Sequence, residues 1–308
     1  FISIHDLSLY EFHEILDKAV KMKADPDDYR KSLKRKVLAM IFQKPSLRTR
    51  MTFEVGMLEL GGQAIYLGPA DGQVGDRESF YDVGKNLERW VDGVVIRTFA
   101  HQNIIDLAAA VKIPVINALS DLLHPCQAMA DFLTLKEKVG HLTKLRLAYV
   151  GDGNNVCHSL MFAAAKAGSK MAVATPPGYE PKPEIVKLAG EDGKDTGFAL
   201  TLTNDPREAV SGADAVYTDT WTSMGQEAEK LARSRVFLPF QVNSALMARA
   251  KKGAFFMHCL PAHRGDEVTD EVIDSPTSLV FDQAENRLHV QKAIMLLLMG
   301  KSEKKKNA

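Results

Sequence analysis

Short apolar runs alternate with segments of helical periodicity along most of this chain. The runs are rich in aliphatic and β-branched side chains, and the segments between them repeat apolar residues every three or four positions. Such alternation is typical of parallel sheets, because consecutive parallel strands need a helical crossover between them. The predicted strands are 37–42, 64–67, 93–98, 114–118, 145–150, 171–175, 199–202, 215–219 and 254–258.

The helical segments carry local signals for where they begin and which face they bury. Ser8 and Ser46 are expected to cap their helices, and Met51, Val55 and Leu58 form the expected apolar face of the second one. The last helix is apolar on several sides, which indicates burial. The predicted helices are 8–22, 46–60, 79–90, 102–111, 125–138, 155–167 and 284–299, with a polar connector at 24–36 and a charged tail at 301–308.

The length and the restart of the pattern after the helix at 125–140 predict two domains. A chain of 308 residues exceeds the size at which one core usually stops growing. We predict an α/β protein with two domains, each a mainly parallel sheet flanked by helices. The domains are residues 1–130 and 131–283, and the C-terminal helix 284–300 packs back between the domains or onto the first.

Composition narrows the classes of partner. Lysine plus arginine and aspartate plus glutamate both count 39, so no overall field favours nucleic acid or an anionic membrane. Three scattered cysteines fit neither a disulfide framework nor a structural zinc site. No basic segment precedes an apolar run at the start, and no run reaches about 18 apolar residues. The expectation is a cytoplasmic protein without a structural zinc site, a nucleic-acid partner or a membrane.

The segment Gln43–Glu54 is a strand-to-helix corner with unusual charge. Arg48 and Arg50 stand in the first helical turn, where positive side chains oppose the helix macrodipole unless an anion offsets them. The unpaired N–H groups of such a turn also suit a phosphate. We therefore expect both guanidinium groups to face an anion bound at this corner.

Further candidate residues follow other predicted strands. Open α/β folds bind ligands at the carboxyl ends of their strands. Arg97, His124-Pro125-Cys126-Gln127, Gly151 to Asn155, Asp219 to Glu227 and His258-Cys259-Leu260-Pro261 all occupy such positions. Gly151 and Gly153 would suit a dinucleotide site, but Val156 stands where the third glycine of that motif belongs.

In order along the chain, these segments resemble the motifs of the aspartate/ornithine carbamoyltransferase family. Pro-Ser-Leu-Arg-Thr-Arg at 45–50 is similar to the family's Ser-Thr-Arg-Thr-Arg signature, with Leu47 in place of a threonine, so that only a backbone contact is expected there. The segments at 124–127, 151–155, 258–261 and 283–287 resemble further motifs of the family. Asp-Thr-Trp-Thr-Ser-Met-Gly at 219–225 is similar to the ornithine branch.

The resemblance implies a function and a set of site residues. The implied reaction transfers the carbamoyl group of carbamoyl phosphate to the δ-amine of L-ornithine, by direct attack without a metal, a cofactor or a covalent intermediate, after closure of the second domain. The implied carbamoyl phosphate ligands are Ser46, Leu47, Arg48, Thr49, Gln73, Arg97, His124, Gln127, Leu260 and Arg287. Those for ornithine are Asn155, Asp219, Ser223, Met224 and Cys259. The implied catalytic residues are Arg97, His124, Cys259, Asp219 and Thr49.

The resemblance also implies a homotrimer in arginine biosynthesis, in which Gln73 reaches the site of a neighbouring subunit. Three alternatives stay open at this point: a carbamoyltransferase for putrescine or an N-acylated ornithine, a dinucleotide-binding protein centred on 151–155, and a relative without catalytic activity. How the amine becomes neutral also stays open. Desolvation on domain closure could lower its pKa, or Asp219 together with Cys259 could take its proton.

Overall fold

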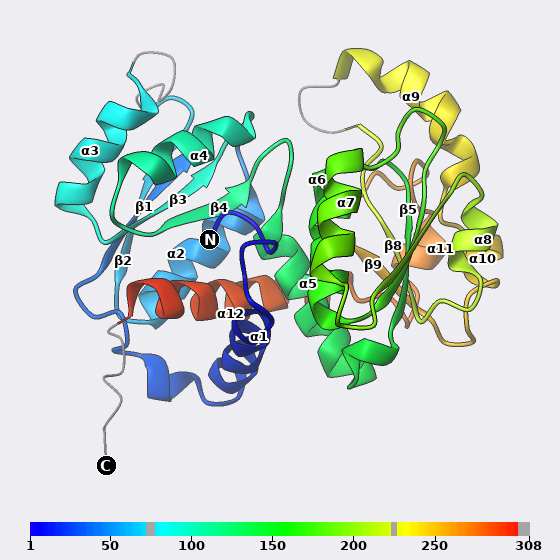
Figure 1. Cartoon of the computed structure of the whole chain (residues 1–308), viewed down its shortest axis with the longest axis horizontal. Helices are drawn as coiled ribbons and strands as arrows, with labels where there is room; N and C mark the ends of the chain where they lie inside the picture. Colours follow the sequence, from blue (N-terminus) through cyan, green and yellow to red (C-terminus); the bar gives the residue numbers. More distant parts are fainter. Residues whose placement is uncertain (72–77, 223–226, 301–308) are drawn as a thin grey trace. The chain divides into compact units, whose positions relative to one another are not determined.

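The computed structural model describes residues 1–71, 78–222 and 227–300 and divides the chain into two compact units (Figure 1). The first unit is Phe1–Leu133 together with the chain from Asn286 onward, and the second is Thr134–Glu285. Each contains a parallel sheet flanked by helices, which confirms the predicted α/β class. The chain passes from the first unit to the second within helix α5 (Pro125–Val139) and returns within helix α12 (Val280–Met299). The sequence had suggested these boundaries after residues 130 and 283.

In the part of the chain that the structure describes, the first unit has a four-stranded sheet of order β2–β1–β3–β4. Its strands are β1 (Val37–Phe42), β2 (Gln63–Leu67), β3 (Gly93–Arg97) and β4 (Val115–Leu119). Its helices are α1 (Leu9–Ala24), η1 (Pro26–Tyr29), α2 (Leu47–Glu59), α3 (Phe80–Trp90), α4 (His101–Ala110) and the adjoining parts of α5 and α12. Phe42 pairs with Arg97 in the ladder, so the corner that leads into α2 lies beside the end of β3.

Two helix layers cover the sheet of the first unit. Alternate side chains of β1 and β3, such as Ile41 and Ile96, pack against α3 and α4 in one core cluster. Helices α2 and α12 lie together away from α3 and α4 (Figure 1). A Cβ atom at Gly56 of α2 would come within 2.8 Å of the Met295 side chain in α12. The predicted return of the C-terminal helix is thus a return onto the first unit.

The prediction for helix α2 was right about its cap and wrong about its buried face. The Ser46 hydroxyl caps the helix by accepting from the Thr49 N–H at 3.3 Å. Met51 is 48% and Leu58 73% exposed, while Phe53 is fully buried. The buried face is turned toward α12. The two helices approach so closely at Gly56 that no side chain would fit at this position.

The second unit, within the described residues, has a five-stranded parallel sheet of order β7–β6–β5–β8–β9. Its strands are β5 (Arg146–Val150), β6 (Lys170–Ala174), β7 (Ala199–Thr203), β8 (Ala215–Thr218) and β9 (Phe255–His258). Its helices are η2 (Leu142–Lys144), α6 (Asn155–Ala167), α7 (Pro183–Asp192), α8 (Pro206–Val210), η3 (Glu227–Glu229), α9 (Lys230–Phe237), η4 (Leu238–Phe240), α10 (Ser244–Met247) and α11 (Asp270–Ile273).

Helices lie on both faces of this second sheet (Figure 1). One core cluster joins Ala148 and Val150 of β5 to residues of α8, α10 and α11, while α6 and α7 lie against each other on the opposite face. The sequence had predicted α6 and all five strands but not the helices from α7 to α11. Several of these are one or two turns long, so they show too few periods of apolar spacing to be recognised.

No helix among the described residues is long and apolar enough to cross a membrane.

Candidate active site

In the first unit, one group of candidate residues is built on the N-terminal turn of α2. Thr49 is a polar residue in the first turn of the helix, and yet it is only 1% exposed. Arg48 is half-buried, and Leu47 is 74% exposed, so only the backbone of Leu47 faces the helix end. The turn therefore combines N–H groups, a buried hydroxyl and one guanidinium group at the positive end of the helix dipole.

Arg50 differs from the expectation that both arginines of the turn face an anion. Its Nε donates to Glu54 Oε1 at 2.9 Å, one helical turn later, and its guanidinium lies 3.9 Å from the ring centroid of Tyr66. The carboxylate of Glu54 thus offsets this charge, and no bound anion is needed for it. Within the turn, Arg48 remains the arginine suited to a phosphate.

Arg287 of α12 connects residues of three helices in the first unit. Its Nη1 donates to Gln127 Oε1 at 2.6 Å, and its Nη2 donates to Thr49 Oγ1 at 3.1 Å. Gln127 in turn donates from Nε2 to Asp131 Oδ1 at 2.8 Å, which fixes the direction of its amide. Arg287, Gln127 and Thr49 are all at most 2% exposed, so these hydrogen bonds are shielded from water.

Gln291 supports Arg287 from the next turn of α12. With its amide oriented to suit its neighbours, its oxygen accepts from Arg287 Nε at 3.1 Å and Nη2 at 2.9 Å. Its nitrogen then donates to Thr52 Oγ1 at 2.6 Å. The guanidinium is therefore held from two directions.

His124 precedes α5 and is neutral at physiological pH. Burial lowers its pKa well below the usual 6.5, and the positive charges of Arg287 and Arg97 lower it further. Arg97, the last residue of β3, is 6% exposed, and His124 is 5% exposed. A neutral imidazole beside two guanidinium groups is a hydrogen-bond donor that does not add a third positive charge.

The lowered pKa of His124 makes stability depend on pH. Because the folded pKa lies below 6.5, the unfolded chain binds the proton first, and stability present above pH 6.5 is lost as pH falls toward the folded pKa. Urea unfolding at several pH values should show wild type losing up to about 1.4 kcal/mol per pH unit more than His124→Asn below pH 6.5. Equal pH dependence of the two proteins would contradict this.

In the second unit, a separate group of candidate residues surrounds Asp219, directly after β8. Its Oδ2 accepts from Asn154 Nδ2 at 2.7 Å, and its Oδ1 accepts from Cys259 Sγ at 2.9 Å and from the Thr220 N–H at 2.8 Å. The residue is 4% exposed. Three donors hold this carboxylate in a fixed direction, as a site for a cationic group requires.

Asn154 has a role that the sequence did not reveal, beside the predicted ligand Asn155. Its Oδ1 caps α6 by accepting from the N–H groups of Val156 and Cys157, at 3.0 and 3.2 Å. The same side chain donates to Asp219. Its position directly before a helix was the available signal, since asparagine is a favoured N-cap residue. Asn155 is the first residue of α6 and is half-buried.

A buried ion pair between Arg233 and Asp152 joins α9 to the loop after β5. Nη2 of Arg233 contacts Asp152 Oδ2, and its Nε donates to the Trp221 carbonyl at 2.5 Å. Burial raises the pKa of Asp152 to about 6, although the charge of Arg233 opposes the shift. Arg233 was not predicted, because an arginine in a short polar helix has no local signal of burial.

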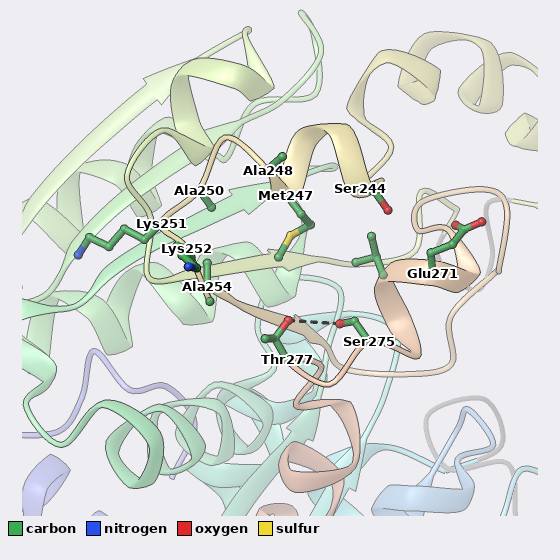
Figure 2. Close-up of a pocket in the computed structure, with 12 residues that line it drawn as sticks. Ser244, Met247, Ala248, Ala250, Lys251, Lys252, Ala254, Glu271, Ser275 and Thr277 are labelled. Atoms are coloured by element: carbon green, nitrogen blue, oxygen red, sulfur yellow. Dashed lines mark hydrogen bonds between the residues drawn. The ribbon is translucent and has the colours of Figure 1, made fainter.

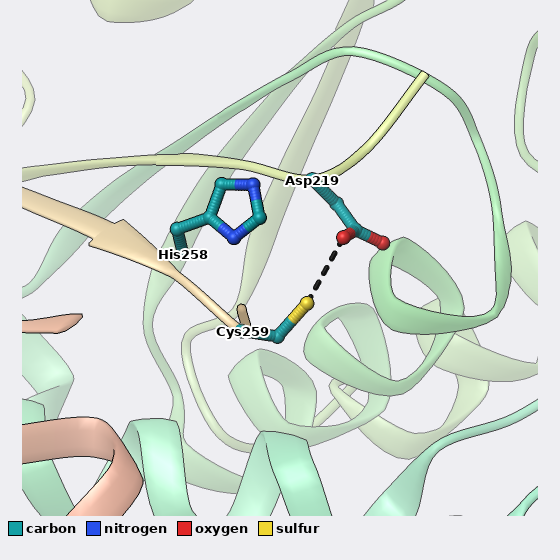
Figure 3. A group of neighbouring side chains, drawn as sticks. All are labelled: Asp219, His258 and Cys259. Atoms are coloured by element: carbon teal, nitrogen blue, oxygen red, sulfur yellow. Dashed lines mark hydrogen bonds between the residues drawn. The ribbon is translucent and has the colours of Figure 1, made fainter. Parts of the chain in front are cut away.

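Asp219, His258 and Cys259 each bring a possible metal ligand within 4.8 Å of the others (Figure 3). Nδ1 of His258 accepts from the Leu260 N–H at 2.9 Å, and Nε2 lies 3.2 Å from Glu267 Oε1. A neutral imidazole has one nitrogen lone pair, and Leu260 already uses it. His258 therefore has no lone pair to offer a metal, and within the group the thiol of Cys259 donates to Asp219.

A separate cavity of about 570 Å³ lies in the second unit, between α10, α11 and the segment that enters β9 (Figure 2). Met247, Lys252 and Ala254 are among its lining residues. None of the predicted site residues lines it. Ala254 precedes β9, whereas Cys259 follows it, so the cavity lies toward the opposite end of that strand.

The structure places the predicted residues in two groups. The first unit contains Ser46, Leu47, Arg48, Thr49, Arg97, His124, Gln127 and Arg287, and the second contains Asn155, Asp219, Cys259 and Leu260. Leu260 was predicted with the carbamoyl phosphate set but belongs to the second unit. Gln73, Ser223 and Met224 lie outside the described residues.

Comparison with known proteins gives matches over nearly the whole chain. Residues 1–137 match the family model "Aspartate/ornithine carbamoyltransferase, carbamoyl-P binding domain", and residues 143–298 match its "Asp/Orn binding domain". The chain is 52% identical to an ornithine carbamoyltransferase of Thermococcus kodakarensis, with 97% of this chain and 96% of that one covered. It is 53% identical to one of Carboxydothermus hydrogenoformans, with 97% of each covered.

A solved structure, ornithine carbamoyltransferase from Pyrococcus furiosus, has the same fold, with a TM-score of 0.94. The two chains are 50% identical, and the match covers 97% of this chain and 96% of the other.

Proposed function

Because the chain belongs to the aspartate/ornithine carbamoyltransferase family, we propose that it transfers the carbamoyl group of carbamoyl phosphate to the δ-amine of L-ornithine. The products are L-citrulline and phosphate. The observation that carries the choice of amine is the buried carboxylate of Asp219. Aspartate would bring further negative charge toward it, whereas ornithine brings ammonium groups.

Carbamoyl phosphate binds in the first unit, with its phosphate at the N-terminal turn of α2. Ser46, Arg48, Thr49 and the backbone N–H of Leu47 hold the phosphate oxygens, together with Arg97. A dianion at this position is stabilised by the helix dipole, by unpaired N–H groups and by two guanidinium groups. Gln73 completes the set. The unusual placement of Arg48 in a first helical turn supports this arrangement.

The carbamoyl group binds next to the phosphate. His124 and Arg287 donate to its carbonyl oxygen, and Gln127 binds its amide, since a glutamine side chain both donates and accepts. The hydrogen bonds of Arg287 with Gln127 and Thr49 support this assignment, because they join the proposed phosphate and carbamoyl ligands into one buried group.

The reaction forms a tetrahedral intermediate with negative charge on the former carbonyl oxygen. Arg97, Thr49 and His124 stabilise this oxyanion. These donors are buried before substrate binds, so little reorganisation is needed when the charge develops. The C–O bond to phosphate then breaks, and phosphate leaves as an anion already bound by arginines.

Ornithine binds in the second unit. Asp219 pairs with an ammonium group of ornithine, Asn155 binds the amino acid, and Ser223 and the Met224 backbone bind polar groups at the far end. Cys259 and the Leu260 carbonyl face the δ-amine. The thiol of Cys259 donates to Asp219 at 2.9 Å, which fixes the direction of its sulfur.

The δ-amine attacks only as the neutral form. A free amine of this type has a pKa near 10.4, and removal from water lowers it because the charged form is penalised. Attack on the carbonyl carbon therefore requires that the amine lose contact with bulk water in the reacting complex. The proton released on attack passes to a nearby base or to the departing phosphate.

Steady-state assays with the purified chain test the proposal. Citrulline formation from carbamoyl phosphate and L-ornithine is measured beside the ureido products of putrescine, N-acetyl-L-ornithine and L-aspartate. We expect kcat/KM for L-ornithine to exceed the others by about 100-fold or more, the discrimination expected from charged groups buried at a site. A higher kcat/KM with another amine would reassign the substrate, and no turnover with any would remove the activity.

We also propose a cytoplasmic homotrimer in which Gln73 enters a neighbour's site. Exposed apolar side chains on α2 and the edge strand β2 support an interface there, because Leu47, Leu58 and Ile65 are 74%, 73% and 51% exposed. A solution mass of three chains by light scattering is the expected result, and the mass of a single chain would contradict the assembly.

A further inference from the structure

A buried carboxylate lies behind the turn that follows β9. Glu267 is 0% exposed and is not among the residues to which we assign a substrate. It is nine residues from His258 in sequence, and its Oε1 lies 3.2 Å from His258 Nε2. His258 is itself 0% exposed. A charge buried this deeply is costly unless nearby donors stabilise it.

The hydrogen bonds of His258 determine its tautomer. The Leu260 N–H donates to His258 Nδ1 at 2.9 Å, and a backbone N–H can only donate. Nδ1 is therefore the acceptor, and the ring proton is on Nε2, where it donates to Glu267. The carboxylate thus fixes the tautomer that holds the Leu260 N–H.

Leu260 needs such support. Its φ of +56° lies in the left-handed region, which is unfavourable for a residue with a Cβ atom. The left-handed residue thus joins two groups of the site. One is the Cys259 thiol, which donates to Asp219, and the other is the Leu260 carbonyl, which we assign to the δ-amine. Strained backbone of this kind persists only where surrounding contacts determine it.

Glu267 also contacts the loop that follows β8, through His263. Its Oε1 accepts from the His263 N–H at 2.6 Å, and its Oε2 lies 3.7 Å from His263 Nδ1. The Thr220 hydroxyl donates its single proton to the Thr222 carbonyl at 3.0 Å, so it accepts from His263 Nδ1 at 3.1 Å. Thr220 directly follows Asp219.

We propose that Glu267 is a positioning residue for the amine half of the reaction. It fixes the His258 tautomer, holds the Cys259–Leu260 turn in its left-handed conformation, and connects that turn through His263 to the loop that carries Asp219. The inference rests on the proposed function, because it assigns Glu267 to the geometry around ornithine. Carbamoyl phosphate, bound by residues of the first unit, is not part of its role.

The test compares Glu267→Ala and Glu267→Gln with wild type. Alanine leaves the His258 Nε2–H and the His263 N–H without their acceptor, and displacement of a reacting group by about 1 Å costs roughly 100-fold. We expect kcat/KM for L-ornithine to fall by about that factor, with KM for carbamoyl phosphate within twofold of wild type. Glutamine keeps one oxygen for both donors and should restore most of the loss.

Asp192→Asn is the matched control. Asp192 pairs with Lys166 at 3.0 Å in the same unit, and their side chains are 9% and 8% exposed. Its replacement disturbs a buried ion pair remote from the strand ends that carry the site. We expect a lower unfolding temperature with an unchanged kcat/KM for ornithine.

A double-mutant cycle tests whether Glu267 acts through its histidine. Asparagine at 258 keeps an acceptor near the Leu260 N–H without needing the carboxylate. Adding Glu267→Ala to His258→Asn should therefore cost much less than it costs in wild type. Additive losses would overturn the role through His258, and an equal effect on both substrates or unchanged ornithine kinetics in Glu267→Ala would overturn the positioning role as a whole. A wild-type protein without citrulline formation would instead overturn the proposed function.

Discussion

Arg287→Met is expected to lower kcat/KM for carbamoyl phosphate by about 1,000-fold, since loss of one preorganised donor costs 100- to 1,000-fold. The side chain is 2% exposed and donates to both Gln127 and Thr49. Methionine fills much of the volume but donates nothing. The substitution therefore removes a proposed donor to the carbonyl oxygen and releases the two side chains that Arg287 positions.

A second effect of Arg287→Met is electrostatic. The positive charge of Arg287 is one of the causes, after burial, that lower the pKa of His124. Its removal should raise that pKa toward 6.5. NMR titration of the imidazole should detect the shift, and an unchanged His124 titration would show that the two groups are not electrostatically coupled.

Lys292→Met is the matched control on the same helix. Lys292 is also 2% exposed, and its Nζ lies 2.6 Å from Glu59 Oε2. Its loss should reduce stability by removing a buried charge from its partner, while kcat/KM stays within a few-fold of wild type. If Lys292→Met reduced activity as strongly as Arg287→Met, general destabilisation of α12 would explain both results.

Asp219→Asn is expected to lower kcat/KM for L-ornithine by about 100- to 1,000-fold, while KM for carbamoyl phosphate changes less than twofold. Loss of one partner from a buried ion pair costs about 3–5 kcal/mol, which corresponds to this range or more. The amide keeps the shape of the carboxylate but not its charge. It also places an NH₂ group toward donors, since Asn154, Thr220 and Cys259 all donate to Asp219.

Cys259→Ser keeps the charge of Asp219 and replaces only the sulfur that donates to it. A serine hydroxyl still donates to the carboxylate, so ornithine kinetics should be affected less than in Asp219→Asn. Substrate profiles with L-ornithine and N-acetyl-L-ornithine give a further readout, because acetylation removes the α-ammonium group. If Asp219→Asn left the preference for L-ornithine over N-acetyl-L-ornithine unchanged, Asp219 would not pair with the α-ammonium.

Local sequence patterns were sufficient for most of the framework. Each strand of the two described sheets was predicted from its apolar run, and the signal is clearest in buried strands such as β1, β3 and β5, which show little alternation. The capping of α1 by Ser8 was also predicted from a local signal, since serine is a favoured N-cap residue. The structure has a full capping box there with Glu11. The start of α12 at Val280 was missed, since the pattern became clear only from Ala284.

Faces and partners were predicted less well. Met51 and Leu58 have helical spacing, yet both are exposed, because the neighbour of α2 is a helix more than 200 residues later in the chain. Arg50 was assigned to an anion, although Glu54, four positions on, neutralises it. Spacing shows which side chains share a face but not which face another element will cover.

The sequence alone thus determined which residues lie at the carboxyl ends of the strands. Parallel strands carry their carboxyl ends to one edge, so residues after successive strands are brought near each other wherever the sheet forms. The bonds from Arg287 to Gln127 and Thr49 span 160 and 238 residues. Only the tertiary structure decided these contacts, and with them the buried position of Glu267, because burial and hydrogen-bond partners at such separations depend on how whole elements pack.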